Sequence, residues 1–148
     1  MIYTIKVTRS VLREDASPLP MVNARAVYDY AMRNCYKDED MWKEVLWMLV
    51  LDKNCSVVSQ YKVSEGGQDQ CIMDKKVVAR IALQFLASGV IIVHNHPSGD
   101  SRPSQADIRQ TDDMKKALGL FDIPLIDHVI VGEGEFFSFA EEQKTTIK

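Results

Sequence analysis

Two patterns of hydrophobic and polar residues alternate along this chain, one typical of strands and the other typical of helices. Residues 45–51 are all apolar, which indicates a strand covered on both faces of its sheet. Residues 77–86 repeat apolar side chains at helical spacing, with Asp74 as the expected N-cap and Gly89 as the expected C-terminal stop. Strands are predicted at residues 2–7, 45–51, 56–63, 90–94, 125–131 and 135–139, and helices at 23–33, 74–89 and 104–119.

The order of these elements predicts an α/β fold with a three-layer α-β-α arrangement and a central mixed sheet. The first strand is expected at an edge of the sheet, and the proline-containing segment 10–20 is expected to be a loop. From Glu141 onward the chain is polar, so this tail is expected to fray. No repeat or linker divides the 148 residues, which indicates a single domain spanning residues 1–148.

The composition, 46% hydrophobic and 26% charged, is ordinary for a soluble globular protein, and we expect a cytoplasmic location because no secretory signal is recognisable. No apolar run reaches the roughly 20 residues that span a membrane. The net charge of −3 and the absence of a long basic stripe do not favour a nucleic-acid partner. Cys35, Cys55 and Cys71 are odd in number and widely spaced, so they are expected to be reduced thiols.

The candidate chemistry is concentrated in residues 90–107. His94 and His96 follow an apolar run at positions i and i+2, so an extended chain directs both imidazoles to the same side of the sheet. Pro97 ends the strand, and Ser104 and Asp107 then lie on one face of a starting helix. Two imidazoles and one carboxylate form a set of zinc ligands with an open fourth position, as in catalytic zinc sites.

Each part of this pattern also has a simpler explanation. Ser104 is a good helix N-cap, and Asp107 is the acidic third residue of a near capping box. Their combination with His94 and His96 within 14 residues nevertheless favours a metal site. Other zinc enzymes fit less well: a zinc deaminase needs His-x-Glu and Pro-Cys-x-x-Cys, a metal-dependent barrel needs about 250 residues, and a cupin-like site needs an all-β chain.

The spacing of His94, His96, Ser104 and Asp107 resembles the JAMM signature of JAB/MPN metalloproteases. The surrounding words His-Asn-His-Pro-Ser-Gly-Asp, Arg-Pro-Ser-Gln-Ala-Asp, Leu-Ile-Asp-His-Val-Ile-Val-Gly and Phe-Phe-Ser-Phe are similar to the JAB domain of bacterial RadC-like proteins. The resemblance covers about residues 41–140. It implies a cytidine-deaminase-like JAB/MPN fold, onto which an N-terminal strand and helix would pack.

The resemblance also implies a function, which is hydrolysis of a peptide or isopeptide bond by water that Zn²⁺ activates. It assigns His94, His96 and Asp107 as zinc ligands, and Ser104 as a group that holds the water or stabilises the oxyanion. The family calls for a glutamate on an early strand, and Glu44, fifty residues before His94, meets this description as general base. Glu39 and Asp40 lie outside the strand pattern and are weaker candidates for this role.

Two further interpretations stay open at this point. His128 shares a strand face with Ile126 and Ile130, opposite Asp127, so we expect a packed histidine near the site instead of a zinc ligand. The competing function is a non-enzymatic or DNA-repair-associated accessory protein of the RadC family, for which a nucleic-acid partner rests on family association alone. For the hydrolase, the partner would be a peptide or protein substrate.

Overall fold

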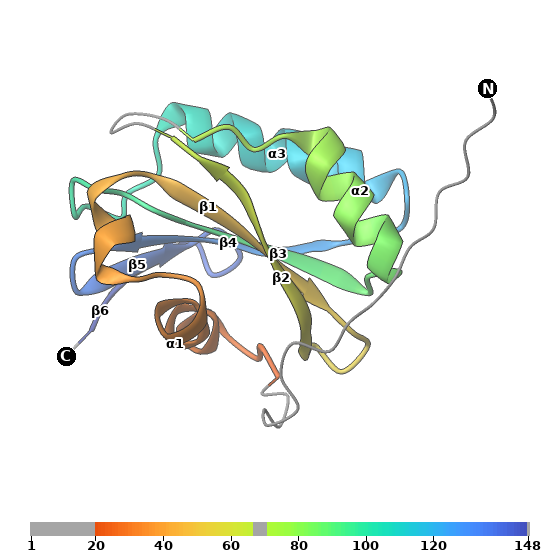
Figure 1. The fold of residues 1–148 in the computed structure, drawn as a ribbon, viewed down its shortest axis with the longest axis horizontal. Helices are drawn as coiled ribbons and strands as arrows, with labels where there is room; N and C mark the ends of the chain where they lie inside the picture. The colour runs from red at the N-terminus through yellow and green to blue at the C-terminus, as the bar shows by residue number, and fades with distance from the viewer. Residues whose placement is uncertain (1–19, 67–70, 148) are drawn as a thin grey trace.

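The computed structural model describes residues 20–66 and 71–147, which form a mixed sheet between two layers of helices (Figure 1). Within these residues the strand order is β2-β1-β3-β4-β5-β6; β3 and β4 are parallel and the other neighbours are antiparallel. The strands are β1 (Val45–Leu51), β2 (Val57–Glu65), β3 (Gly89–Asn95), β4 (Leu125–Gly132), β5 (Glu135–Ser138) and β6 (Gln143–Thr146). The helices are α1 (Ala24–Asn34), α2 (Lys75–Phe85) and α3 (Gln105–Gly119), with a 3-10 turn, η1 (Asp38–Trp42).

Two hydrophobic clusters separate the layers and confirm the predicted three-layer α/β fold. On one face α1 packs on the sheet, as Val27 with Leu49 illustrates. On the other face α2 and α3 pack on the sheet, as Val78 and Met114 with Met48 illustrate. Neighbouring residues of β1 therefore face opposite clusters, which explains why this strand is apolar throughout.

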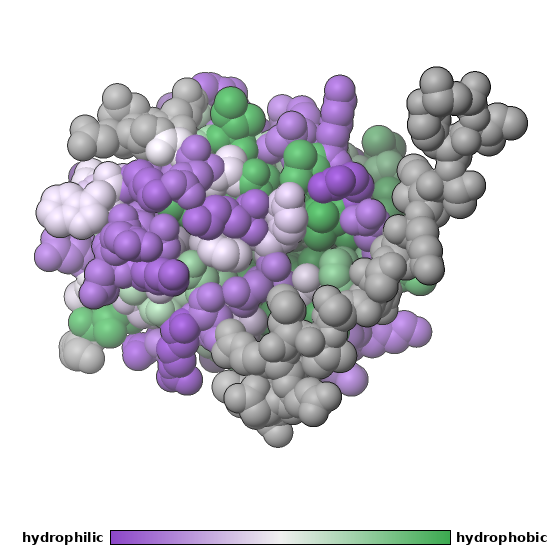
Figure 2. Space-filling model, viewed as in Figure 1, coloured by the Kyte–Doolittle hydropathy of each residue, from purple (hydrophilic) through white to green (hydrophobic). Residues whose placement is uncertain are grey.

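The surface is mostly hydrophilic, as expected when the hydrophobic residues are buried between the sheet and the helices. Hydrophilic side chains cover most of the face shown in Figure 2, and hydrophobic ones show mainly near α2 and α3. Within residues 20–66 and 71–147, no helix is both long enough and apolar enough to cross a membrane. The predicted strand at residues 2–7 and nearly all of the predicted loop at 10–20 lie outside the described residues.

The sequence predicts that Gly89 ends the helix after Asp74, and this prediction is wrong. The helix ends at Phe85, and Leu86 follows in the left-handed conformation with its N–H bonded to the carbonyls of Ala82 and Leu83. Gly89 is instead the first residue of β3, where a Cβ atom would lie 2.8 Å from the side chain of Ile126. A larger residue there would have to displace the Ile126 side chain, so packing between strands accounts for this glycine better than the helix terminus does.

The predicted fraying of the tail after Glu141 is also wrong. Residues 143–146 form β6, which pairs antiparallel with β5. Lys144 Nζ lies 2.7 Å from Glu135 Oε1, and the same oxygen accepts a hydrogen bond from Ser101 N. The tail is therefore connected, through Glu135, to the loop that follows β3.

The loop that follows β3 is in close backbone contact with the β4–β5 hairpin. Glu133 N donates to Gly99 O over 2.7 Å, and Gly99 has a φ of +83°, which favours glycine. A Cβ atom at Gly132 would lie 2.4 Å from Gly99 O, so only glycine fits there without displacing the loop. The segment between His96 and Ser104 thus rests directly on the β4–β5 hairpin.

We expect Gly132→Ala to displace this loop and to lower the free energy of unfolding by about 1–3 kcal/mol, the usual cost of overpacking. Gly119→Ala is the matched control, because among the described residues a Cβ there would meet no atom within 4 Å. Urea unfolding of both variants measures the difference. Equal stability of the two variants would contradict the close contact at Gly132.

Candidate metal site

Four side chains converge at the end of β3. Glu44, His94, His96 and Asp107 each offer one ligand atom, and these atoms all lie within 4.8 Å of one another. Glu44 directly precedes β1, His94 lies near the end of β3, His96 directly follows that strand, and Asp107 is in the first turn of α3. The structure therefore brings together the three predicted ligands and the predicted base.

The distances within this cluster are short. Asp107 Oδ1 lies 3.3 Å from His94 Nε2, and its Oδ2 lies 3.4 Å from His96 Nε2. Glu44 Oε1 lies 3.6 Å from His94 Nε2, and the two Nε2 atoms are 3.0 Å apart. Glu44, His94 and Asp107 are buried, whereas His96 is partly exposed.

Backbone hydrogen bonds orient the ligands. His96 Nδ1 lies 2.8 Å from the carbonyl oxygen of Asp100, which can only accept, so Nδ1 carries a proton and Nε2 faces the cluster. Asp107 and Ser104 form the capping box that the sequence predicts: Asp107 N donates to Ser104 Oγ over 3.1 Å, and Ser104 N donates to Asp107 Oδ2 over 2.7 Å. Because Ser104 Oγ accepts this bond, its own proton remains available to donate.

Asn95, between the two histidines, fixes the position of Glu44. Its side chain is fully buried, and its Oδ1 accepts a hydrogen bond from Val45 N over 2.8 Å. Its Nδ2 donates to Lys43 O over 2.9 Å. The amide thus holds the backbone on both sides of Glu44, a role that the sequence analysis missed. The only signal in the sequence was a polar residue whose side chain points away from the histidines, into the opposite face.

The charges in the cluster are mutually stabilising. Burial raises the pKa of Asp107, but hydrogen bonds from His94, His96 and Ser104 outweigh it and hold that pKa well below its usual range. For His96, burial lowers the pKa, and the hydrogen bonds to Asp107 and to the Asp100 carbonyl outweigh it, so the net shift is upward. With both imidazoles neutral the four side chains carry a net charge of −2, which one divalent cation would balance.

The donor set fits such a cation. Zinc is bound in proteins by imidazole nitrogen and by carboxylate oxygen, which are the atoms present here. Two imidazole nitrogens that face each other at 3.0 Å also repel unless a proton or a cation lies between them. The cluster is therefore a candidate metal site, formed by Glu44, His94, His96 and Asp107.

The comparison with known proteins agrees with these observations. The RadC-like JAB domain family matches residues 21–144. The chain belongs to this family. It is 39% identical to a UPF0758 protein of Porphyromonas gingivalis over 104 residues, which are 70% of this chain and 46% of that protein.

Other UPF0758 proteins are similar to this JAB domain at comparable identity. It is 43% identical to a UPF0758 protein of Vibrio cholerae over 69% of this chain and 46% of that protein, and 38% identical to one of Shewanella baltica over 82% and 52%. The chain thus spans about half the length of the curated relatives it matches. The predicted resemblance is confirmed, and the three helices and six-stranded mixed sheet of the described residues are consistent with a JAB/MPN fold.

The remaining acidic and histidine candidates lie outside the four-residue cluster of the JAB domain. Asp40 is buried, and its Oδ2 accepts a hydrogen bond from Lys37 N at the start of η1. Asp127 accepts hydrogen bonds from Ser138 Oγ and Ala140 N, so it holds the turn after β5. His128 is buried behind His94, with its Nε2 2.7 Å from His94 Nδ1. Burial lowers the pKa of His128 well below its usual value, so its ring is neutral.

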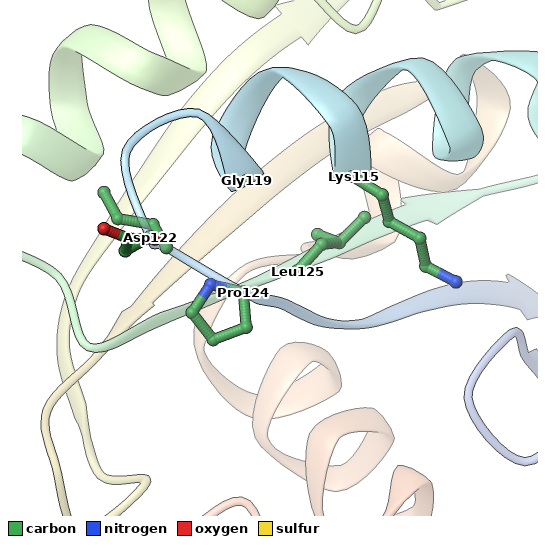
Figure 3. A pocket seen from close by; sticks show the side chains of 6 residues that line it. Lys115, Gly119, Asp122, Pro124 and Leu125 are labelled. Atoms are coloured by element: carbon green, nitrogen blue, oxygen red, sulfur yellow. The ribbon is translucent and has the colours of Figure 1, made fainter.

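A surface hollow of about 450 Å³ lies at the far end of α3 from the cluster (Figure 3). It is lined by Lys115, Gly119, Asp122, Ile123, Pro124 and Leu125. Asp107 is in the first turn of α3 and Gly119 is its last residue, so a helix of this length separates the two places by roughly 18 Å. The hollow therefore contributes nothing to the metal site.

We expect Asn95→Asp to lower the free energy of unfolding by about 1–3 kcal/mol, because a carboxylate keeps the bond from Val45 N but cannot donate to Lys43 O. Asn54→Asp makes the same change at an exposed position and is the control. Urea unfolding of both variants tests this expectation. If Asn95→Asp is as stable as Asn54→Asp, the amide does not hold the Glu44 segment.

Proposed function

We propose that this chain is a zinc-dependent hydrolase of the JAMM type that cleaves a peptide or isopeptide bond with water. The observation that carries the proposal is the convergence of Glu44, His94, His96 and Asp107 within 4.8 Å at a partly exposed site. Membership of the RadC-like JAB domain family supports it.

The residues divide into those that bind and those that react. His94 and His96 would hold the metal through Nε2, and Asp107 through a carboxylate oxygen that the helix cap already orients. When bound, zinc acts as a Lewis acid that polarises a carbonyl and makes water nucleophilic at neutral pH. The partly exposed His96 marks the side from which a substrate would approach.

In this proposal Glu44 would transfer protons. Its carboxylate lies 3.6 Å from His94 Nε2, so it reaches the point at which the ligand atoms converge. A buried carboxylate at this position would accept a proton from the attacking water and pass it to the leaving amine. Ser104 would donate its hydroxyl proton to the oxyanion, a contribution of about 3 kcal/mol for one well-placed donor.

The first prediction of this proposal concerns metal content. Elemental analysis of the purified protein should find about one zinc per chain, because the two imidazoles and the carboxylate supply three ligands. We expect His96→Ala to lose the zinc, since the remaining ligands no longer surround the ion. Full zinc occupancy in His96→Ala would contradict the assignment of the ligands.

The second prediction separates catalysis from metal binding. We expect Glu44→Gln to retain zinc and to lower the rate of peptide or isopeptide hydrolysis by about 10²- to 10⁴-fold, the usual contribution of a general base. Glu39→Gln is the control, because Glu39 is an exposed acid of the same segment. Hydrolysis of a mixed peptide library, followed by mass spectrometry, gives the rates. Equal rates for wild type and Glu44→Gln would contradict the role of Glu44.

A zinc-loaded wild-type protein that hydrolyses no member of the library would instead favour the non-enzymatic accessory function. The site of the described residues would then bind metal for a structural or regulatory purpose. A separate measurement of DNA binding by the same protein would test the association with repair directly. The net charge of −3 predicts that this binding is weak.

A further inference from the structure

A buried chain of hydrogen bonds runs behind the metal site, from α3 through β4 to β3. Thr111 Oγ1 lies 2.6 Å from His128 Nδ1, and His128 Nε2 lies 2.7 Å from His94 Nδ1. Thr111 Oγ1 also lies 2.6 Å from the carbonyl oxygen of Asp107, one turn earlier in α3. Thr111, His128 and His94 are each only 1% exposed, so water does not compete for these bonds.

The direction of each bond follows from the chemistry of its atoms. A carbonyl oxygen can only accept, so Thr111 donates its single hydroxyl proton to Asp107 O. The hydroxyl oxygen can then only accept from His128, which places a proton on His128 Nδ1. The threonine side chain therefore determines which nitrogen of His128 is protonated.

The same reasoning extends to His94. The His128 ring is buried and stacked on Phe139, with centroids 4.9 Å apart and planes at 6°, a setting that favours the neutral imidazole. With its proton on Nδ1, His128 has a bare Nε2 and accepts from His94 Nδ1. Where a cation replaces the proton shared with Asp107, His94 thus keeps its single proton on Nδ1, away from the cluster, and its Nε2 faces Asp107 and Glu44.

We propose that Thr111 and His128 are positioning residues that fix the tautomer of His94, so that its Nε2 presents a lone pair to the metal. The inference rests on the proposed metal function and adds two residues that would not touch the metal. His96 also carries its proton on Nδ1, because that nitrogen donates to the carbonyl oxygen of Asp100, which can only accept. For His94 the acceptor is another imidazole, which could donate or accept, and Thr111 removes that ambiguity.

The arrangement also links two ligands through one helix. Asp107 and Thr111 are four residues apart in α3, so the helix that carries one ligand also carries the hydroxyl group that orients another. Without the hydroxyl, His128 Nδ1–H would have no acceptor, and the tautomer with the proton on Nε2 would gain population. That tautomer would donate to His94 Nδ1 and place the His94 proton on Nε2, where it would block the metal.

The experiment compares Thr111→Val with Thr111→Ser. Valine keeps the shape of threonine and removes the hydroxyl, whereas serine keeps the hydroxyl and removes a methyl group. Zinc affinity is measured by competition with a chromogenic chelator. We expect Thr111→Val to bind zinc about 10- to 100-fold more weakly than wild type, the usual effect of removing a group that orients a histidine ligand, and Thr111→Ser to bind close to wild type.

A second measurement does not depend on any variant. Ring-nitrogen NMR of the zinc-loaded wild-type protein should show His128 protonated on Nδ1 and bare on Nε2. If His128 carries its proton on Nε2, or if a folded Thr111→Val binds zinc as tightly as wild type, the positioning role is wrong while the metal site stands. A wild-type protein that binds no zinc would overturn both. If Thr111→Val does not fold, the NMR result on wild type decides.

Discussion

The antiparallel register between β1 and β3 is the constraint on which the site depends. Leu46 pairs with His94, so the chain just before β1 carries Glu44 alongside the end of β3. A slip of one residue would turn Glu44 to the opposite face of the sheet, toward α1. Asn95 opposes such a slip, because its amide binds the peptide groups on both sides of Glu44. One residue between two histidines thus fixes the glutamate that precedes another strand.

The site also concentrates charge in a place where charge is costly. Two carboxylates are buried at Glu44 and Asp107, and an isolated buried carboxylate is strongly unfavourable. The imidazoles and the helix cap offset this cost without a metal, as the lowered pKa of Asp107 indicates. A bound cation would replace protons in this role, so metal affinity should fall as the pH is lowered.

The local parts of the site could be predicted from the sequence, and the non-local parts could not. His94, His96, Ser104 and Asp107 lie in one strand–turn–helix segment, where the spacing alone puts the side chains on one side. Glu44 lies fifty residues earlier, and only a family resemblance pointed to it. Asn95 and Thr111 were missed because a buried polar residue acquires its role from partners on other elements, which no local pattern encodes.

The errors in the fold have the same origin. Gly89 has the features of a helix stop, but it begins β3 and lies close to Ile126 on the neighbouring strand. The polar residues of β6 carry no hydrophobic alternation, so their pairing with β5 was invisible in the sequence. By contrast, the caps Asp74 and Ser104 were both predicted, because a cap is an interaction within one turn of chain.

The most direct test of the central claim is a zinc-edge anomalous diffraction map of crystals grown with zinc. The account predicts one strong peak enclosed by His94 Nε2, His96 Nε2 and an Asp107 carboxylate oxygen, at zinc–nitrogen distances of about 2.0–2.1 Å and a zinc–oxygen distance of about 2.0–2.2 Å. Glu44 should lie beside this peak. A fully occupied zinc elsewhere on the chain, with no peak among these residues, would contradict it.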